Sequence, residues 1–206
     1  MTKFLKILGL GLLFLGFLPA HSAKAQTAAR DIQRAEDYLR GLGTLKADFI
    51  QKAYNGQRLT GTFYLDRPGK LRFEYDNIDD FIVADGLFIY FYDGELKEQT
   101  NAPIGQTLAD FLLRDNISLR DDVTVKQISR EDQFLTMTIV ETSDPTAGSV
   151  KLFFTETPFA LNKWEVTDAA GITTEIMLRN IQRDINLPAS LFAYFNPDKD
   201  KQRYNN

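Results

Sequence analysis

Apolar and polar residues alternate with two different periods along this chain. Between Thr27 and Leu42 apolar side chains recur every three or four residues, which predicts an amphipathic helix ended by Gly41 and Gly43. After residue 44 the period becomes two, as expected for strands that bury one face. Such strands are predicted over residues 45–49, 59–65, 71–75, 81–84, 87–92, 95–100, 123–128, 134–140, 150–154, 161–166 and 172–181. Ten or eleven short strands with frequent turns indicate one domain built on an antiparallel sheet that curls or closes.

The predicted sheet has one apolar face, rich in Phe and Leu, that has to be buried. Three segments are available to cover it: the first helix, a helically spaced stretch over 104–112 and a short apolar piece over 187–195. A curled sheet filled by its own side chains fits this pattern. An incomplete barrel with an apolar cavity under a helical lid fits it equally well.

Arg67 is a charged residue that lies an even number of positions after Phe63 and Leu65, so it has the same strand parity as these residues of the apolar face. If the strand continues to this position, the side chain points to the apolar side. The guanidinium then offers five N–H donors to carbonyl groups of a nearby lid. The alternative is an arginine in the turn Asp66–Gly69 whose side chain extends into solvent.

Residues 1–25 have the character of a secretory signal. Lys3 and Lys6 precede an apolar run over 7–18, and Ala23-Lys24-Ala25 matches a cleavage site. The run is shorter than the roughly 20 residues that span a bilayer. We therefore expect this segment to be removed, so that residues 26–206 form a single exported domain. Removal takes away three Lys and leaves 21 basic against 28 acidic residues, a net charge of −7.

Composition narrows the chemistry available to the mature chain. The sequence has no Cys and one His, and His21 leaves with the signal. Sites that pair a nucleophile with histidine, cysteine-ligated metals and thiol chemistry are therefore excluded. The acidic pairs Asp79-Asp80 and Asp121-Asp122 fall in predicted turns, and no motif sets two carboxylates in a cleft or gathers a metal site. The negative net charge is unsuited to phosphate backbones. We expect no enzyme, no metal, no cofactor and no nucleic-acid partner.

The segment Gly61–Tyr75, which reads GTFYLDRPGKLRFEY, resembles the core signature of the LolA family of periplasmic outer-membrane lipoprotein carriers. Segments Phe49–Gln51, Ile82–Gly86 and Leu187–Phe195 are similar to the family in order and spacing. The resemblance covers residues 39–195. The connection over 115–125 and the charged tail over 198–201 match no element of the family.

This resemblance implies a mainly β fold, an incomplete, half-open antiparallel β-barrel of about eleven strands with an N-terminal helix and a helical lid over 104–112. It implies that Arg67 latches the lid in the closed form by bonding to helix backbone. The acyl chains of a ligand are expected to lie against Phe49, Phe63, Leu65, Leu71, Phe73, Tyr75, Leu108 and Phe111.

The implied function is that of a soluble periplasmic carrier, expected to be a monomer. It would accept acylated lipoproteins from an inner-membrane ABC transporter and deliver them to an outer-membrane receptor. A membrane-anchored receptor of similar fold is disfavoured, because it needs a lipidated N-terminal Cys. Two alternatives stay open. One is a related periplasmic barrel that binds or senses a different lipid or lipoprotein, and the other is a β-sandwich adhesin with a filled core.

Overall fold

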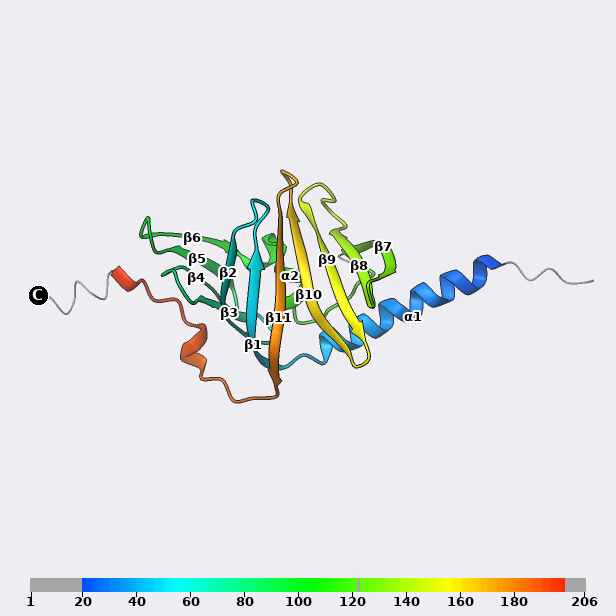
Figure 1. The fold of residues 1–206 in the computed structure, drawn as a ribbon, viewed down its shortest axis with the longest axis horizontal. Coiled ribbons are helices and arrows are strands. Elements are labelled where there is room, and N and C mark those ends of the chain that lie inside the picture. Colours follow the sequence, from blue (N-terminus) through cyan, green and yellow to red (C-terminus); the bar gives the residue numbers. More distant parts are fainter. Residues whose placement is uncertain (1–19, 122, 199–206) are drawn as a thin grey trace, which may run out of the picture.

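The computed structural model describes residues 20–121 and 123–198 (Figure 1). Most of the predicted signal segment and the end of the charged tail lie outside the described residues. Within them, helix α1 (Ala20–Arg40) leads into eleven strands. The strands are β1 (Thr44–Lys52), β2 (Arg58–Asp66), β3 (Lys70–Tyr75), β4 (Phe81–Asp85), β5 (Phe88–Asp93), β6 (Glu98–Pro103), β7 (Val123–Glu131), β8 (Phe134–Glu141), β9 (Gly148–Glu156), β10 (Phe159–Asp168) and β11 (Thr173–Arg183).

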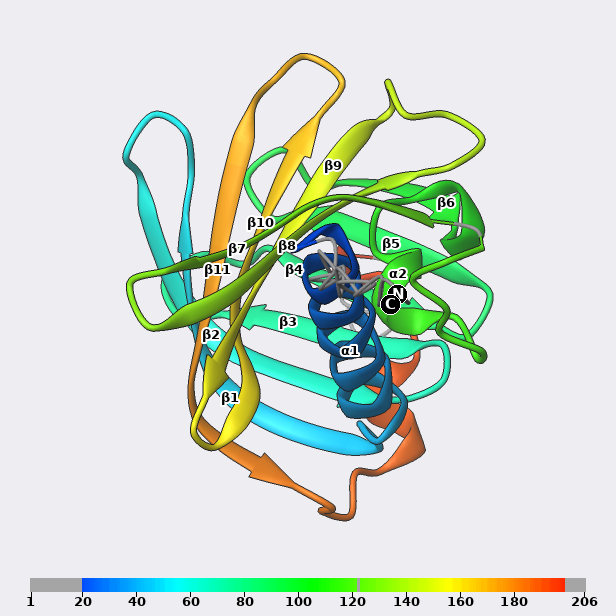
Figure 2. The same cartoon turned by 90° about the vertical axis from the view of Figure 1, so that its right-hand side faces the viewer.

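These strands form a single antiparallel sheet in the order β6-β5-β4-β3-β2-β1-β11-β10-β9-β8-β7. The chain meanders from β1 to β6, leaves the sheet, re-enters at β7 and returns to pair β11 with β1. The sheet curls strongly, and α1 and the short helix α2 (Asp110–Leu113) lie on its concave side (Figure 2). In the part of the chain that is described, β6 and β7 are the two unpaired edges. The predicted mainly β fold, an incomplete antiparallel barrel, is confirmed.

The core fills the space between the concave face of the sheet and the helices. Ala35 and Leu39 of α1 are fully buried, because they lie four residues apart on one face of the helix. Between them, Tyr38 packs edge-on against the rings of Phe154 and Phe159, each with a centroid distance of 5.9 Å. Within residues 20–121 and 123–198, no helix combines the length and apolar character that a membrane span requires.

Polar contacts hold α1 against the β7–β10 half of the sheet. Asp31, only 6% exposed, accepts hydrogen bonds of 2.9 and 3.1 Å from the guanidinium of Arg130 on β7. Glu36 is more deeply buried and accepts a 2.8 Å hydrogen bond from the backbone N–H of Leu119. Buried carboxylates persist only when they are paired in this way. The two acidic side chains therefore fix the position of the helix.

Replacing Arg130 by Ala is expected to lower the free energy of unfolding by about 2 kcal/mol, because Asp31 stays buried and loses both donors. The Arg130 side chain is 47% exposed, so solvent screens part of the interaction and the loss stays below that of a fully buried pair. Urea denaturation measures the change. Arg179→Ala, at an exposed position on β11, is the control and should stay within about 0.5 kcal/mol of the parent. Equal losses in the two variants would contradict the anchoring role.

Several element ends differ from the prediction. The pattern predicts a helix from Thr27, whereas α1 begins at Ala20 and ends at Arg40. It also predicts a strand from Glu95, whereas β6 begins at Glu98. The Asp93 carboxylate accepts hydrogen bonds from the backbone N–H groups of Glu95 and Leu96, at 3.0 and 2.8 Å. These bonds close a turn where the apolar pattern alone suggests an extended chain.

The predicted lid over 104–112 is two short helices rather than one. They are the 3₁₀ turn η1 (Ile104–Gln106) and α2. Thr107 separates them with an extended backbone, and both its hydroxyl and its N–H donate to the carbonyl of Ile104, at 2.8 and 3.0 Å. Phe111 and Leu112 are nevertheless buried, so the apolar stripe of the lid still faces the sheet.

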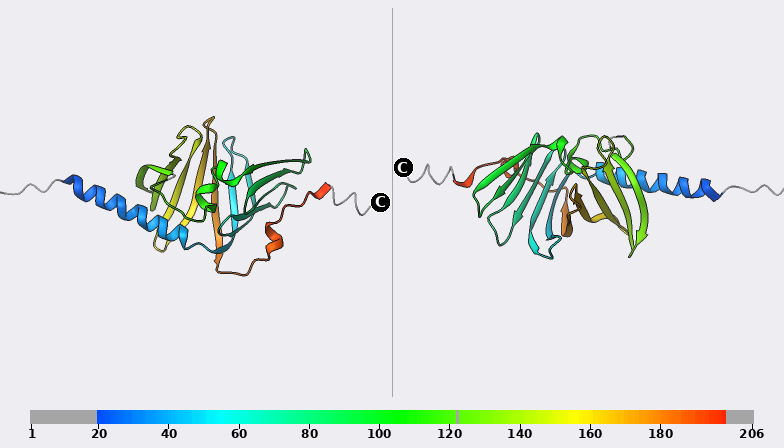
Figure 3. Two further views of the ribbon diagram at one scale, coloured as in Figure 1. Left: turned by 180° about the vertical axis from the view of Figure 1, so that it is seen from behind. Right: turned by 90° about the horizontal axis from the view of Figure 1, so that it is seen from above.

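The apolar C-terminal segment packs on the outer face of the sheet, not on the inner face that it could have covered. It contains the 3₁₀ turn η2 (Ala189–Phe192) and runs along the β3–β5 half, away from α1 (Figure 3). The ring of Tyr194 stacks on Tyr90 with a centroid distance of 4.7 Å. Arg72 on β3 donates a 3.4 Å hydrogen bond to the carbonyl of Leu191. Among the described residues, α1 and the segment over 104–113 are therefore what covers the concave face.

Candidate ligand-binding cavity

A cavity of about 360 Å³ lies between the concave face of the sheet and the lid. Its wall is formed by β1–β5, β10 and β11 and by the lid. The lining residues are Gln51, Phe63, Leu71, Phe73, Tyr75, Ile82, Ile89, Phe91, Leu108, Ala109, Phe111, Leu112, Trp164, Val166, Thr174 and Ile176. Nearly all of these side chains are apolar, which suits a hydrocarbon ligand.

Strand register explains the aromatic part of this wall. Phe63 on β2 lies directly opposite Phe73 on β3, and Phe73 lies opposite Ile82 on β4. The rings of Phe63 and Phe73 are 4.6 Å apart, and Trp164 of β10 lies 5.9 Å from Phe63. Cross-strand neighbours on one face of a sheet are in contact. The alternating pattern of several separate segments therefore builds one continuous apolar surface.

The structure brings six of the eight predicted ligand-contacting residues to the cavity wall. They are Phe63, Leu71, Phe73, Tyr75, Leu108 and Phe111. Phe49 and Leu65 are placed differently: each is 1% exposed and belongs to the core beside the cavity. Phe49 meets the rings of Phe73 and Tyr75 edge-on at 5.0 and 5.2 Å. It therefore supports the wall from within the core.

Ten further lining residues are not among the predicted ones. They are Gln51, Ile82, Ile89, Phe91, Ala109, Leu112, Trp164, Val166, Thr174 and Ile176. Strand parity could have found several of them, since Ile89 and Phe91 alternate on β5. Parity could not have found Trp164. A β-bulge between Leu161 and Lys163 shifts the alternation of β10, so Trp164 faces the same side as Leu161 although the two are three residues apart.

A hydrogen-bonded polar pair lies in this apolar wall. The hydroxyl of Tyr75 donates a 2.8 Å hydrogen bond to Oε1 of Gln51. Burial raises the pKa of Tyr75 to about 12, helped by the negative charge of Asp80. The phenol is therefore neutral at physiological pH and acts as a hydrogen-bond donor.

Arg67 connects the turn between β2 and β3 to the ends of both helices. Its guanidinium reaches across to backbone carbonyls rather than into solvent. The five acceptors are the carbonyl oxygens of Leu39 (2.7 Å), Arg40 (3.5 Å), Leu112 (2.8 Å), Arg114 (2.7 Å) and Asp115 (3.2 Å). Carbonyls at helix C-termini lack partners within the helix and carry partial negative charge, so a cation fits there.

The same turn makes a second bond to the lid, from the N–H of Gly69 to the carbonyl of Leu113 at 2.9 Å. Partial burial lowers the pKa of Arg67 from its ordinary value, and the nearby Asp115 opposes this shift. The guanidinium nevertheless stays protonated, because an arginine pKa starts far above the physiological range. We call the bonds from Arg67 and Gly69 to residues 112–115 the lid contacts. Any opening of α2 has to break them.

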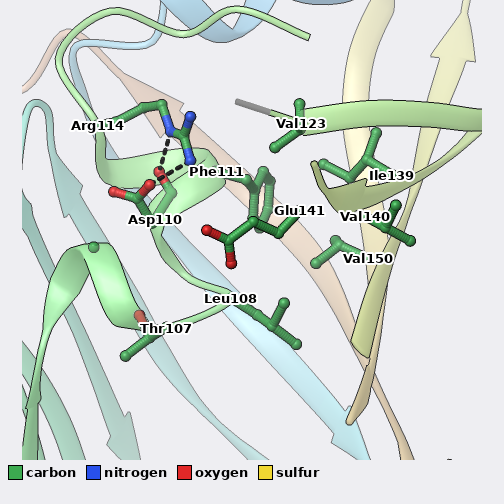
Figure 4. Close-up of a pocket in the computed structure, with 11 residues that line it drawn as sticks. Thr107, Leu108, Asp110, Phe111, Arg114, Val123, Ile139, Val140, Glu141 and Val150 are labelled. Atoms are coloured by element: carbon green, nitrogen blue, oxygen red, sulfur yellow. Dashed lines mark hydrogen bonds and ion pairs between the residues drawn. The ribbon is translucent and has the colours of Figure 1, made fainter. Parts of the chain in front are cut away.

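A second, smaller hollow of about 30 Å³ lies on the other side of α2, towards β7–β9 (Figure 4). Val123, Ile139 and Val150 line it from the sheet. Leu108 and Phe111 line both hollows, so the lid forms a partition between them. The ion pair between Asp110 and Arg114 of the lid also lines this smaller hollow.

An incomplete antiparallel barrel with an apolar cavity under a lid is the architecture of a class of proteins suited to enclosing apolar ligands. The family model described as "Outer membrane lipoprotein carrier protein LolA" matches residues 40–195. The chain belongs to the LolA family.

Curated relatives agree with this assignment over most of their length. An outer-membrane lipoprotein carrier protein from Methylococcus capsulatus is 29% identical and covers 96% of this chain and 96% of its own. The protein of the same name from Dechloromonas aromatica is 32% identical, over 81% of this chain and 84% of its own. One from Legionella pneumophila is 32% identical, over 91% and 94%.

Proposed function

We propose that this protein is a periplasmic carrier that encloses the acyl chains of lipoproteins between the inner and the outer membrane. The observation that carries the proposal is the apolar cavity under a lid held by hydrogen bonds. Membership in the family and the names of the relatives support lipoprotein as the cargo. The secretory character of residues 1–25 supports the periplasm as the location.

The energetic problem of such a carrier is that acylated lipoproteins hardly leave a membrane on their own. Each buried CH₂ contributes about 0.8 kcal/mol to membrane affinity, so several chains make spontaneous release extremely slow. A carrier has to offer a comparable apolar surface and give it up later. The wall that includes Phe63, Leu71 and Phe73 offers that surface, and the lid controls access to it.

The transport cycle we infer begins with an empty protein whose lid contacts are closed. An energy-driven ABC transporter in the inner membrane opens the lid and inserts acyl chains against the cavity wall, with Leu108 and Phe111 moving with the lid. The loaded carrier, a monomer, then meets a receptor in the outer membrane. Re-formation of the bonds from Arg67 to residues 112–115 favours the empty form and so helps release.

The decisive experiment offers the delipidated protein a triacylated lipopeptide and the same peptide without acyl chains. We expect a one-to-one complex with the acylated peptide in native mass spectrometry and none with the bare peptide. Equal binding of both, or binding of neither, would contradict the proposal. A second measurement tests the alternative of a related barrel that carries or senses a different lipid. Mass spectrometry identifies the lipid that co-purifies with the protein, and phospholipid or fatty acid in place of lipoprotein would favour that alternative.

A further inference from the structure

The cavity is apolar except at one end, where three polar side chains gather. Gln51, Tyr75 and Thr174 lie on β1, β3 and β11. Gln51 is paired with Ile176 on β11, so Thr174 lies one inward-facing position further towards the same end. On the other side of β1, Tyr75 is paired with Gly61 of β2. The polar end is therefore built by the register of four neighbouring strands.

Gly61 allows Tyr75 to reach Gln51. Phe49 and Tyr75 face Gly61 from β1 and β3, and with no side chain on Gly61 the two rings meet at 5.2 Å across β2. The phenol hydroxyl then extends over β2 to Gln51, two residues beyond Phe49 on β1. A side chain at position 61 would separate the two residues.

The bond from Tyr75 fixes which donors face the cavity. Because the Tyr75 hydroxyl donates to Oε1 of Gln51, the amide plane is held and its two N–H donors are left for another acceptor. Within the part of the chain that the structure describes, neither the Nε2 group of Gln51 nor the hydroxyl of Thr174 bonds to another residue. These donors lie at the edge of a space that is otherwise lined by hydrocarbon.

We propose that Gln51, oriented by Tyr75, donates a hydrogen bond to the carbonyl oxygen of the ester or amide that joins an acyl chain to its headgroup. The inference rests on the proposed function, since it assumes an acylated ligand. An ester carbonyl that enters an apolar cavity gives up its hydrogen bonds to water and needs a donor there. Gln51 supplies one at the polar end, so the chain extends from there towards Phe63 and the lid. Thr174 offers a second donor beside it.

This arrangement makes the cavity selective for chemistry and not only for hydrophobicity. A chain joined by an ether has the same length and nearly the same shape as an ester-linked one but lacks the carbonyl acceptor. We expect the protein to bind the ester-linked ligand about five- to tenfold more tightly, the range that corresponds to one hydrogen bond.

The test compares two synthetic lipopeptides that differ only in ester or ether linkage of two chains to a glyceryl-cysteine. Affinities are measured by calorimetry for the parent protein, Gln51→Leu and Tyr75→Phe. In Gln51→Leu the affinity for the ester ligand is expected to fall to that for the ether ligand, which stays unchanged. In Tyr75→Phe the preference is expected to shrink two- to threefold, because Gln51 keeps its donors but loses its orientation. An unchanged ether affinity also reports that the cavity is intact.

Tyr64→Phe is the matched control. Tyr64 lies on the same sheet but is not part of the cavity wall, and the ammonium of Lys46 lies 5.6 Å from its ring centroid. This variant should keep the full preference for the ester. The inference is overturned if the parent binds the ester and the ether ligand equally, or if Gln51→Leu still prefers the ester. In either case the carrier function stands, because both lipopeptides still bind. If the parent binds neither ligand, the carrier function fails as well.

Discussion

Replacing Arg67 by Leu is expected to give a protein that takes up acylated cargo but passes it on about tenfold more slowly or worse. Three of the five hydrogen bonds of Arg67 go to Leu112, Arg114 and Asp115 in and after the lid. Hydrogen bonds that involve a charged donor contribute roughly 1.5–3 kcal/mol each. Losing them destabilises the closed, empty form relative to the loaded one. Loading therefore stays favourable, and release becomes less so.

A reconstituted transfer assay, in which labelled lipoprotein moves from the carrier to a receptor, measures this effect. Arg67→Lys is the informative companion. It keeps the charge but has three donors on one nitrogen instead of five spread over a planar fork, so it should lie between the parent and Arg67→Leu. Arg58→Leu, at the exposed beginning of the preceding strand β2, is the matched control and should transfer normally. Normal transfer by Arg67→Leu would refute the role assigned to the lid contacts.

Gly61→Ala is expected to destabilise the fold by about 3 kcal/mol or more, the largest effect on stability that we predict. A Cβ atom at this position would lie 1.9 Å from the carbonyl oxygen of Glu74 and 2.7 Å from Cε1 of Phe49. Real Cβ atoms do not approach other atoms so closely, so β2 and β3 would have to separate. Phe49, which is 1% exposed, has little room to move.

Thermal and urea unfolding of Gly61→Ala measure this loss. Gly105→Ala is its control, since a Cβ there meets no atom within 4 Å and the substitution should be nearly neutral. A stability within about 1 kcal/mol of the parent for Gly61→Ala would mean that the two strands can yield at this point. The close approach of β2 to β3 would then be unimportant for the fold.

The sheet was predictable from the sequence because a half-buried strand has to alternate. Phe63, Leu71 and Phe73 sit on the predicted face, and their pairing follows from the meander. The break between β7 and β8 was predicted, but the backbone conformation of its turn was not. Asp132 and Gln133 both have positive φ angles, 47° and 73°, at a place where no Gly announces a turn.

The composition of the cavity wall was less predictable than the fold, because parity separates inside from outside but not core from cavity. Phe49 and Leu65 have the same parity as Phe63, yet the placement of α1 and the lid puts them in the core beside the cavity. The acceptors of Arg67 are backbone carbonyls, which every residue possesses. Only the three-dimensional path of the chain could identify them.

Among the described residues, β6 and β7 are unpaired edges, so no strand ladder closes the barrel between them. A cavity of about 360 Å³ is at the small end of the range for single small-molecule ligands, and a triacylated cargo demands more. In a closed cylinder, widening would break a ladder of interstrand hydrogen bonds. Here no ladder joins β6 to β7, so their separation breaks no interstrand hydrogen bond. We therefore expect the cavity to widen at this seam when acyl chains enter, so that one protein accommodates cargoes of different bulk.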